Sequence, residues 1–186
     1  MEVIEIPPDS QKRLLGLARQ TLETFVRGEA RQSTPTEDPL FLDTRYGVFV
    51  SLHRGAELRG CIGTCSPLSP LYQEVIDMTE AAASRDYRVE PVQIRELSEV
   101  IIELSIVSPL QVLADPLTIE IGKHGLHIAN GENRGVLLPQ VATEYGWNQE
   151  TFLRQTCLKA GLSKNAWKWP ETKLSAFTAL ILKEEK

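Results

Sequence analysis

A cysteine between two glycines is the strongest chemical signal in the sequence, in the segment Arg59-Gly60-Cys61-Ile62-Gly63-Thr64. A thiolate is both a nucleophile and a metal ligand, and a neighbouring guanidinium favours the thiolate form of a cysteine. Cys61 beside Arg59 is therefore a candidate nucleophile or thiolate ligand. The alternative is a small cysteine buried in a kinked strand, since free cysteine is among the most buried residue types.

Imidazoles are the natural general bases for such a thiol. His53 precedes the cysteine segment, and His124 and His127 lie together further along the chain. We take His124 as the leading candidate, on the condition that the fold brings it to Cys61. The pair Cys61 and Cys65 is a weak zinc pattern, because no second pair of ligands follows. We therefore predict no metal site, and the sequence leaves any cofactor open.

The two glycines suggest where a cleft lies. Glycine weakens a strand, so two within one strand indicate a bulge or the close approach of another backbone or a ligand. The segment Arg85-Asp86-Tyr87-Arg88 adds an acid between two arginines, which either positions an anionic substrate or forms a surface ion pair. We expect a cleft for substrate or partner to be lined by Gly60, Gly63, Thr64, Arg85 and Asp86.

Glu103 is a further candidate, because it interrupts an otherwise apolar strand. An ionised carboxylate in such a place needs a partner or faces a cleft. An exposed strand face explains it equally well.

The elements that position these residues follow from apolar spacing and from turn residues. We expect helices over residues 9–26 and after Asn148, and a helix that begins at Pro70 with Ser69 as its N-cap. Residues 29–39 suit a surface loop. The expected strands are 46–53 and 58–64 as one hairpin, 102–106, a short strand at 119–121, 125–130 and 134–138 as a second hairpin, and 174–182. Strands and helices do not alternate regularly, which favours an α+β fold with a mixed or antiparallel sheet flanked by helices.

Composition excludes several classes of protein. The chain has 186 residues, 42% of them hydrophobic and 24% charged, with a net charge of −5. These values are ordinary for a globular protein. No apolar run of transmembrane length exists, and the acidic N-terminus does not resemble a signal peptide. An odd count of three cysteines favours reduced thiols and a cytoplasmic location.

Residues 151–170 carry four basic side chains, no acidic one, and the aromatic pair Trp167 and Trp169. Basic residues among aromatics can bind single-stranded nucleic acid. The alternative is a solvated helix face followed by tryptophans that close the core. We favour packing, because the net charge and the lack of an RNA-binding motif argue against nucleic acid.

The segment Leu58-Arg59-Gly60-Cys61-Ile62-Gly63-Thr64 resembles the hallmark motif of the AMMECR-one domain family. Further matches follow in the same order along the chain, at residues 47–50, 81–86, 122–126, 137–142, Glu144 with Trp147, and 159–162. The resemblance covers residues 9–183, so we treat 1–186 as a single domain of this type. One departure stands at Asp86-Tyr87-Arg88-Val89, where the family usually has Asp-Pro-Arg-Phe.

The resemblance implies a sheet flanked by helices, with a smaller subdomain beside the main one. It also implies partners, because prokaryotic members are often encoded with a Memo-like protein and a radical S-adenosylmethionine protein. It does not imply a particular reaction. Our first hypothesis is therefore an accessory protein that docks such partners through the cleft at Arg59 and Cys61. The alternatives are an enzyme that uses Cys61 and, third, a nucleic-acid-binding protein.

Overall fold

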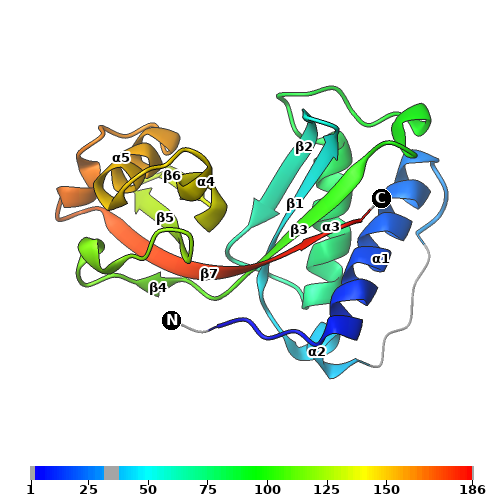
Figure 1. The fold of residues 1–186 in the computed structure, drawn as a ribbon, viewed down its shortest axis with the longest axis horizontal. Coiled ribbons are helices and arrows are strands. Elements are labelled where there is room, and N and C mark those ends of the chain that lie inside the picture. The colour runs from blue at the N-terminus through cyan, green and yellow to red at the C-terminus, as the bar shows by residue number, and fades with distance from the viewer. Residues whose placement is uncertain (1–2, 32–37, 186) are drawn as a thin grey trace. The chain divides into compact units, whose positions relative to one another are not determined.

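The computed structural model describes residues 3–31 and 38–185 and has the expected α+β architecture (Figure 1). The α-helices are α1 (Pro8–Val26), α2 (Pro39–Asp43), α3 (Leu71–Ser84), α4 (Pro139–Glu144) and α5 (Gln149–Lys159). The strands are β1 (Gly47–Arg54), β2 (Glu57–Thr64), β3 (Ile101–Val107), β4 (Gln111–Val112), β5 (His124–Asn130), β6 (Asn133–Leu137) and β7 (Lys173–Lys183). None of the helices in these two ranges is long and apolar enough to cross a membrane.

The chain divides into two compact units. The Cys61 unit consists of Glu5–Val107 and Leu180–Lys186, and the His124 unit consists of Met1–Ile4 and Ser108–Ala179. Strand β7 contributes residues to both units, because the boundary falls within it.

The Cys61 unit is an antiparallel sheet with helices on one face. Strand β1 lies between β2 and β3, and α3 packs against β1 and β2 (Figure 1). The alternating residues Val48, Val50 and Leu52 are fully buried. On β3, Ile102, Leu104 and Ile106 continue this apolar face, as the period of two along a strand requires. The side chains between them, such as Ser51 and Glu103, lie on the opposite face.

The start of α3 differs from the expectation by one residue. The N-cap is Pro70, and Ser69 makes no side-chain cap. The carboxylate of Glu74 instead accepts from the backbone N–H groups of Leu68 and Ser69, at 2.8 and 2.9 Å. A buried acid in the first turn thus replaces the hydroxyl cap, and its charge also suits the positive end of the helix.

The His124 unit has the strand order β4-β7-β5-β6, all antiparallel. Helix α5 packs so closely on β6 that a Cβ at Gly135 would lie 2.7 Å from the backbone nitrogen of Ala160. As expected, Asn148 caps α5, since its side chain accepts from the N–H of Thr151 at 2.9 Å. The apolar core of the unit contains Ile119, Leu126, Ile128, Ala142, Phe152, Leu153, Cys157, Ala160, Ala166, Leu174 and Ala176.

Both hairpins and the first and last elements lie where the sequence predicts them, and Gly28 follows α1 with a φ of 71°. The short strand expected at residues 119–121 is wrong: these residues follow a 3₁₀ turn, and Ile119 packs into the core without pairing to a strand. A run of two isoleucines around one acid has strand periodicity, but the run is too short for periodicity to identify a strand. Within the loop expected at 29–39, residues 32–37 lie outside the described ranges.

Candidate functional site around Cys61

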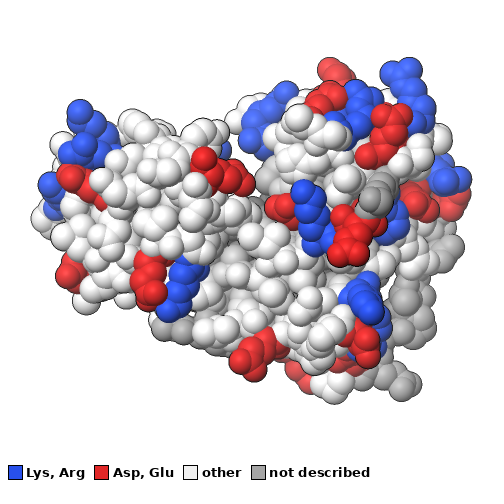
Figure 2. Space-filling model, viewed as in Figure 1, with Lys and Arg blue, Asp and Glu red and all other residues white. Residues whose placement is uncertain are grey.

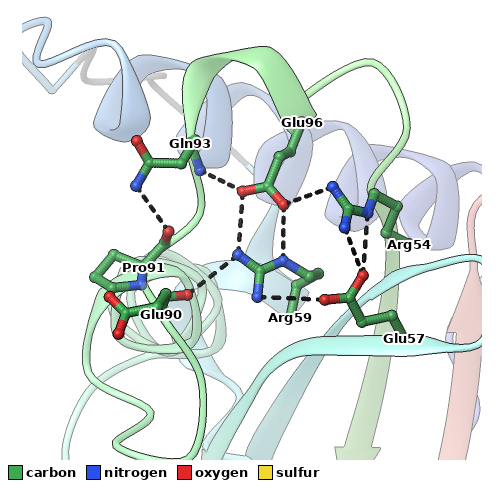
Figure 3. A network of polar contacts seen from close by, with 7 residues as sticks. All are labelled: Arg54, Glu57, Arg59, Glu90, Pro91, Gln93 and Glu96. Atoms are coloured by element: carbon green, nitrogen blue, oxygen red, sulfur yellow. Dashed lines mark hydrogen bonds and ion pairs between the residues drawn. The ribbon is translucent and has the colours of Figure 1, made fainter.

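Arg59 is buried, and its guanidinium belongs to a network of polar contacts around Glu96 (Figure 3). Its guanidinium donates to both carboxylate oxygens of Glu96, at 2.8 Å from Nε and 3.1 Å from Nη2. A further bond reaches the carbonyl oxygen of Glu90 at 3.3 Å. Arg54 donates to the same Glu96 carboxylate at 3.1 Å and also binds Glu57. These bonds hold the pKa of Glu96 below its usual value, mainly through the hydrogen bond from Arg59.

This network corrects the expectation that Arg59 acts on Cys61. The side chain is 9% exposed, and its donors are directed at Glu96, Glu90 and Glu57. Its burial also removes it from a docking surface. The reason lies in the register of β1 and β2. Leu52 pairs with Gly60 and His53 with Leu58, so Arg59 falls in a register shift and has no cross-strand partner on β1. The shift lets its side chain turn toward the 3₁₀ turn η1 (Ile94–Glu96).

Asp86 and Arg88 bind the backbone of Cys61 at the free edge of β2. The N–H of Cys61 donates to Oδ2 of Asp86 at 2.9 Å, and the carbonyl oxygen of Cys61 accepts from Nη2 of Arg88 at 3.2 Å. The two side chains also bind each other, with Arg88 Nε 2.8 Å from Asp86 Oδ1. They therefore satisfy the groups that a further strand would otherwise pair.

The charge pair is unusual because the Asp86 side chain is 1% exposed. Hydrogen bonds from Arg88 and from the backbone lower the pKa of Asp86 far below its usual range, and Asp86 in turn raises the pKa of Arg88. Asp86 is thus a buried, ionised anchor rather than a surface partner. The corner keeps this geometry with Tyr87 in place of the family's usual proline.

Cys61 is half-buried, and its thiol accepts a hydrogen bond from the neighbouring strand. The hydroxyl of Ser51 on β1 donates to Sγ of Cys61 at 3.2 Å. The pKa of Arg88 is raised mainly by its hydrogen bond to Asp86, and Cys61 contributes in the same direction. Arg88, rather than Arg59, is thus the arginine that binds Cys61, through the carbonyl oxygen.

A row of polar side chains crosses the sheet at this level. Ser51 is the cross-strand partner of Cys61 on one side and of Glu103 on the other. Directly paired residues share one face of a sheet, so the three side chains lie together on the face away from α3. Glu103 is half-buried, and its carboxylate makes no hydrogen bond or ion pair with a described residue. His53 follows Ser51 by two residues on β1, so its side chain is on the same face of the sheet, and it supplies the imidazole in the Cys61 unit.

The glycines allow close approach, as expected, but it is the protein itself that approaches. A Cβ at Gly60 would lie 1.9 Å from the carbonyl oxygen of Ala82 in α3. A Cβ at Gly63 would lie 2.3 Å from the ring of Phe49, its cross-strand partner. Both surfaces are therefore filled by packing within the Cys61 unit.

The remaining predicted residues have separate roles. The hydroxyl of Thr64 accepts from the N–H of Ser66 at 3.0 Å, and Arg85 is exposed at the end of α3. His124 lies in the other unit, where its Nδ1 accepts from the N–H of Glu120 at 3.0 Å. Burial lowers the pKa of this imidazole. The set Arg59, Cys61 and His124 is therefore not assembled within one unit.

The other two cysteines are buried. Burial raises the pKa of Cys65 to about 12 and also raises that of Cys157. Over residues 3–31 and 38–185, no group of three or more His, Cys, Asp or Glu side chains is arranged to hold a metal ion.

The basic segment 151–170 has largely structural contacts. Arg154 forms an ion pair with Glu150 at 2.7 Å, and Lys168 lies 4.7 Å from the centre of the Trp167 ring, which packs against the core. On the face shown in Figure 2, blue basic groups stand among red acidic ones. These contacts favour a structural packing role for the segment rather than an extended surface that binds nucleic acid.

Comparison with known proteins agrees with this architecture and with the motifs. The AMMECR1 family model matches residues 15–182. A protein of Methanothermobacter thermautotrophicus is 39% identical over the full length of both chains, and a Thermococcus kodakarensis protein is 41% identical over 92% of this chain and 89% of its own. The crystal structure of an uncharacterised Pyrococcus horikoshii protein, 35% identical, superposes with a TM-score of 0.91 over 98% of this chain and 95% of that one. The chain belongs to the AMMECR1 family.

Proposed function

We propose that the protein is an enzyme that uses the thiolate of Cys61 as a nucleophile. The observation that carries this proposal is the partly exposed Sγ of Cys61, which accepts from the Ser51 hydroxyl at 3.2 Å, on a residue whose carbonyl oxygen binds Arg88. The accessory hypothesis placed first from the sequence loses its main support, because Arg59 is buried and both glycine surfaces are filled.

The reaction class is group transfer to sulfur. The thiol proton passes to solvent water, which the partly exposed Cys61 side chain can reach. The sulfur electron pair then forms a bond to an electrophilic carbon of the substrate, and the leaving group departs with the electrons of the broken bond. Ser51 positions the sulfur through its hydrogen bond, and Arg88 and Asp86 hold the backbone of Cys61 in place.

Cys61 should be alkylated selectively at neutral pH. Iodoacetamide should label Cys61 much faster than Cys65 and Cys157, because burial keeps those two thiols protonated and inaccessible. Ser51→Ala should slow the labelling of Cys61, whereas Ser66→Ala, at an exposed serine in the following loop, should not. Peptide mapping by mass spectrometry measures each rate. Equal, slow labelling of all three cysteines would refute the nucleophile.

A second candidate function is docking of a partner at the turn after α3. Tyr87 is 96% exposed and stands between the exposed residues Arg85 and Arg88. Tyrosine and arginine are the types most enriched among residues that dominate binding energy. The resemblance to the family makes a Memo-like protein the partner to test.

Tyr87→Ala should weaken co-purification with the Memo-like protein by about tenfold or more, the scale of a dominant contact. Tyr145→Ala is the matched control, since Tyr145 is 68% exposed and belongs to the other unit. Equal losses in both variants, or no complex with the unmodified protein, would exclude docking at this turn.

A further inference from the structure

Three side chains that can carry positive charge share one face of the sheet in the His124 unit. Ala129 on β5 is paired with Arg134 on β6 and with Lys173 on β7. Ala129, Arg134 and Lys173 therefore form a row across the sheet with their side chains on the same face. His127 precedes Ala129 by two residues on β5, so its imidazole belongs to this face as well.

This face is opposite to the one that packs against α5. Ser175 and Phe177, which pair with His127 and Gly125, are buried on it, so it is open only near Ala129, where Arg134 and Lys173 lie. Leu126 and Ile128, which alternate with His127, are fully buried in the core beneath α5. Arg134 and Lys173 are exposed, while His127 and Ala129 are half-buried. Adjacent strands are about 4.8 Å apart, so the two long side chains start about 10 Å from each other and can meet over the small Ala129.

The cluster lacks a counter-charge among the described residues. Arg134 and Lys173 form no ion pair with a described carboxylate, and the His127 imidazole makes no hydrogen bond to a described group. The pKa of His127 is lowered, first by burial and then by the charges of Arg134 and Lys173. The charges of Arg134 and Lys173 therefore disfavour protonation of the imidazole. An oxyanion between them would reverse that effect and provide the missing acceptors.

We infer that His127, Arg134 and Lys173 form a binding site for the phosphoryl group of a small phosphorylated ligand. A phosphoryl group offers three acceptor oxygens and up to two charges, which matches three separate donors, one of them a guanidinium. The row does not continue as a basic track. Glu132 stands in the turn beyond Arg134, and Glu171 stands two residues before Lys173. One phosphoryl group fits this patch better than the backbone of a nucleic-acid strand, which needs a continuous positive groove.

The test is an NMR titration of the histidine ring protons in the full-length protein, with pyrophosphate as the probe. The chain has three histidines, so each can be assigned by substitution. Pyrophosphate should bind saturably and raise the pKa of His127, while the resonances of His53 and His124 stay in place. Arg134→Gln or Lys173→Gln should weaken binding by about tenfold each, the effect of losing one charge-assisted hydrogen bond.

The same variants give a second readout without any ligand. Each substitution removes a charge that lowers the pKa of His127, so each should raise that pKa in the free protein. Lys159→Gln is the matched control, because this exposed lysine belongs to α5 on the other face of the sheet, and it should change neither value. Pyrophosphate binding that is absent, or that survives both substitutions, would overturn the site. Tighter binding of oligothymidylate than of pyrophosphate would overturn the inference that the ligand is a small phosphorylated molecule.

Discussion

Arg59→Ala should lower the free energy of unfolding by about 3 kcal/mol, because it breaks a buried ion pair on one side only. The carboxylate of Glu96 is almost fully buried, and it would lose two of its hydrogen bonds. The Gln93 N–H and the more exposed Arg54 would be left to satisfy it, at 2.8 and 3.1 Å. Urea unfolding, followed by far-UV circular dichroism, measures the change.

Arg54→Ala is the matched control, since both arginines bind the same carboxylate. Its side chain is 37% exposed, and its removal leaves the Arg59–Glu96 pair intact. We expect only a small loss of stability, as for other exposed ion pairs. Similar losses of unfolding free energy in the two variants would show that the buried ion pair contributes no more to stability than the exposed one. Unchanged stability of the Arg59→Ala protein would contradict a structural role for Arg59 and make a functional role the better explanation.

Gly60→Ala should be at least as damaging as the loss of Arg59, at about 3 kcal/mol. The new Cβ would lie 1.9 Å from the carbonyl oxygen of Ala82, which is backbone in the last turns of α3. A side chain could rotate away from such a contact, but a helix backbone cannot. Relief therefore requires α3 to move off the sheet that it covers.

Gly16→Ala provides the comparison with the same chemical change. Gly16 lies within α1, and a Cβ there would meet nothing within 4 Å. Replacing glycine by alanine inside a helix stabilises it by up to about 1 kcal/mol. The two substitutions should thus shift the melting temperature in opposite directions. If the Gly60→Ala protein has the same melting temperature as the unmodified protein, the packing of α3 does not depend on this contact.

Local patterns in the sequence were enough to predict most of the secondary structure. The two hairpins, the helix ending before Gly28 and the Asn148 cap each depend on residues close together in the chain, and the structure confirms them. The Ser69 cap was wrong because a rival acceptor, Glu74, lies one turn further into the same helix. The strand at 119–121 was wrong because a short apolar run packs equally well without pairing.

For the candidate site, local sequence patterns were enough to identify the family, a candidate nucleophile and the close approach at Gly60. The groups that contact Cys61 depend on long-range packing. Arg59 is two residues from Cys61 but binds Glu96, whereas Arg88 is 27 residues away and contacts Cys61. A register shift in one hairpin turns Arg59 aside, and the end of α3 delivers Asp86 and Arg88 to the edge of β2. The physical reason is that charged side chains follow whichever buried partner long-range packing brings within hydrogen-bond distance, and spacing along the chain does not encode that distance.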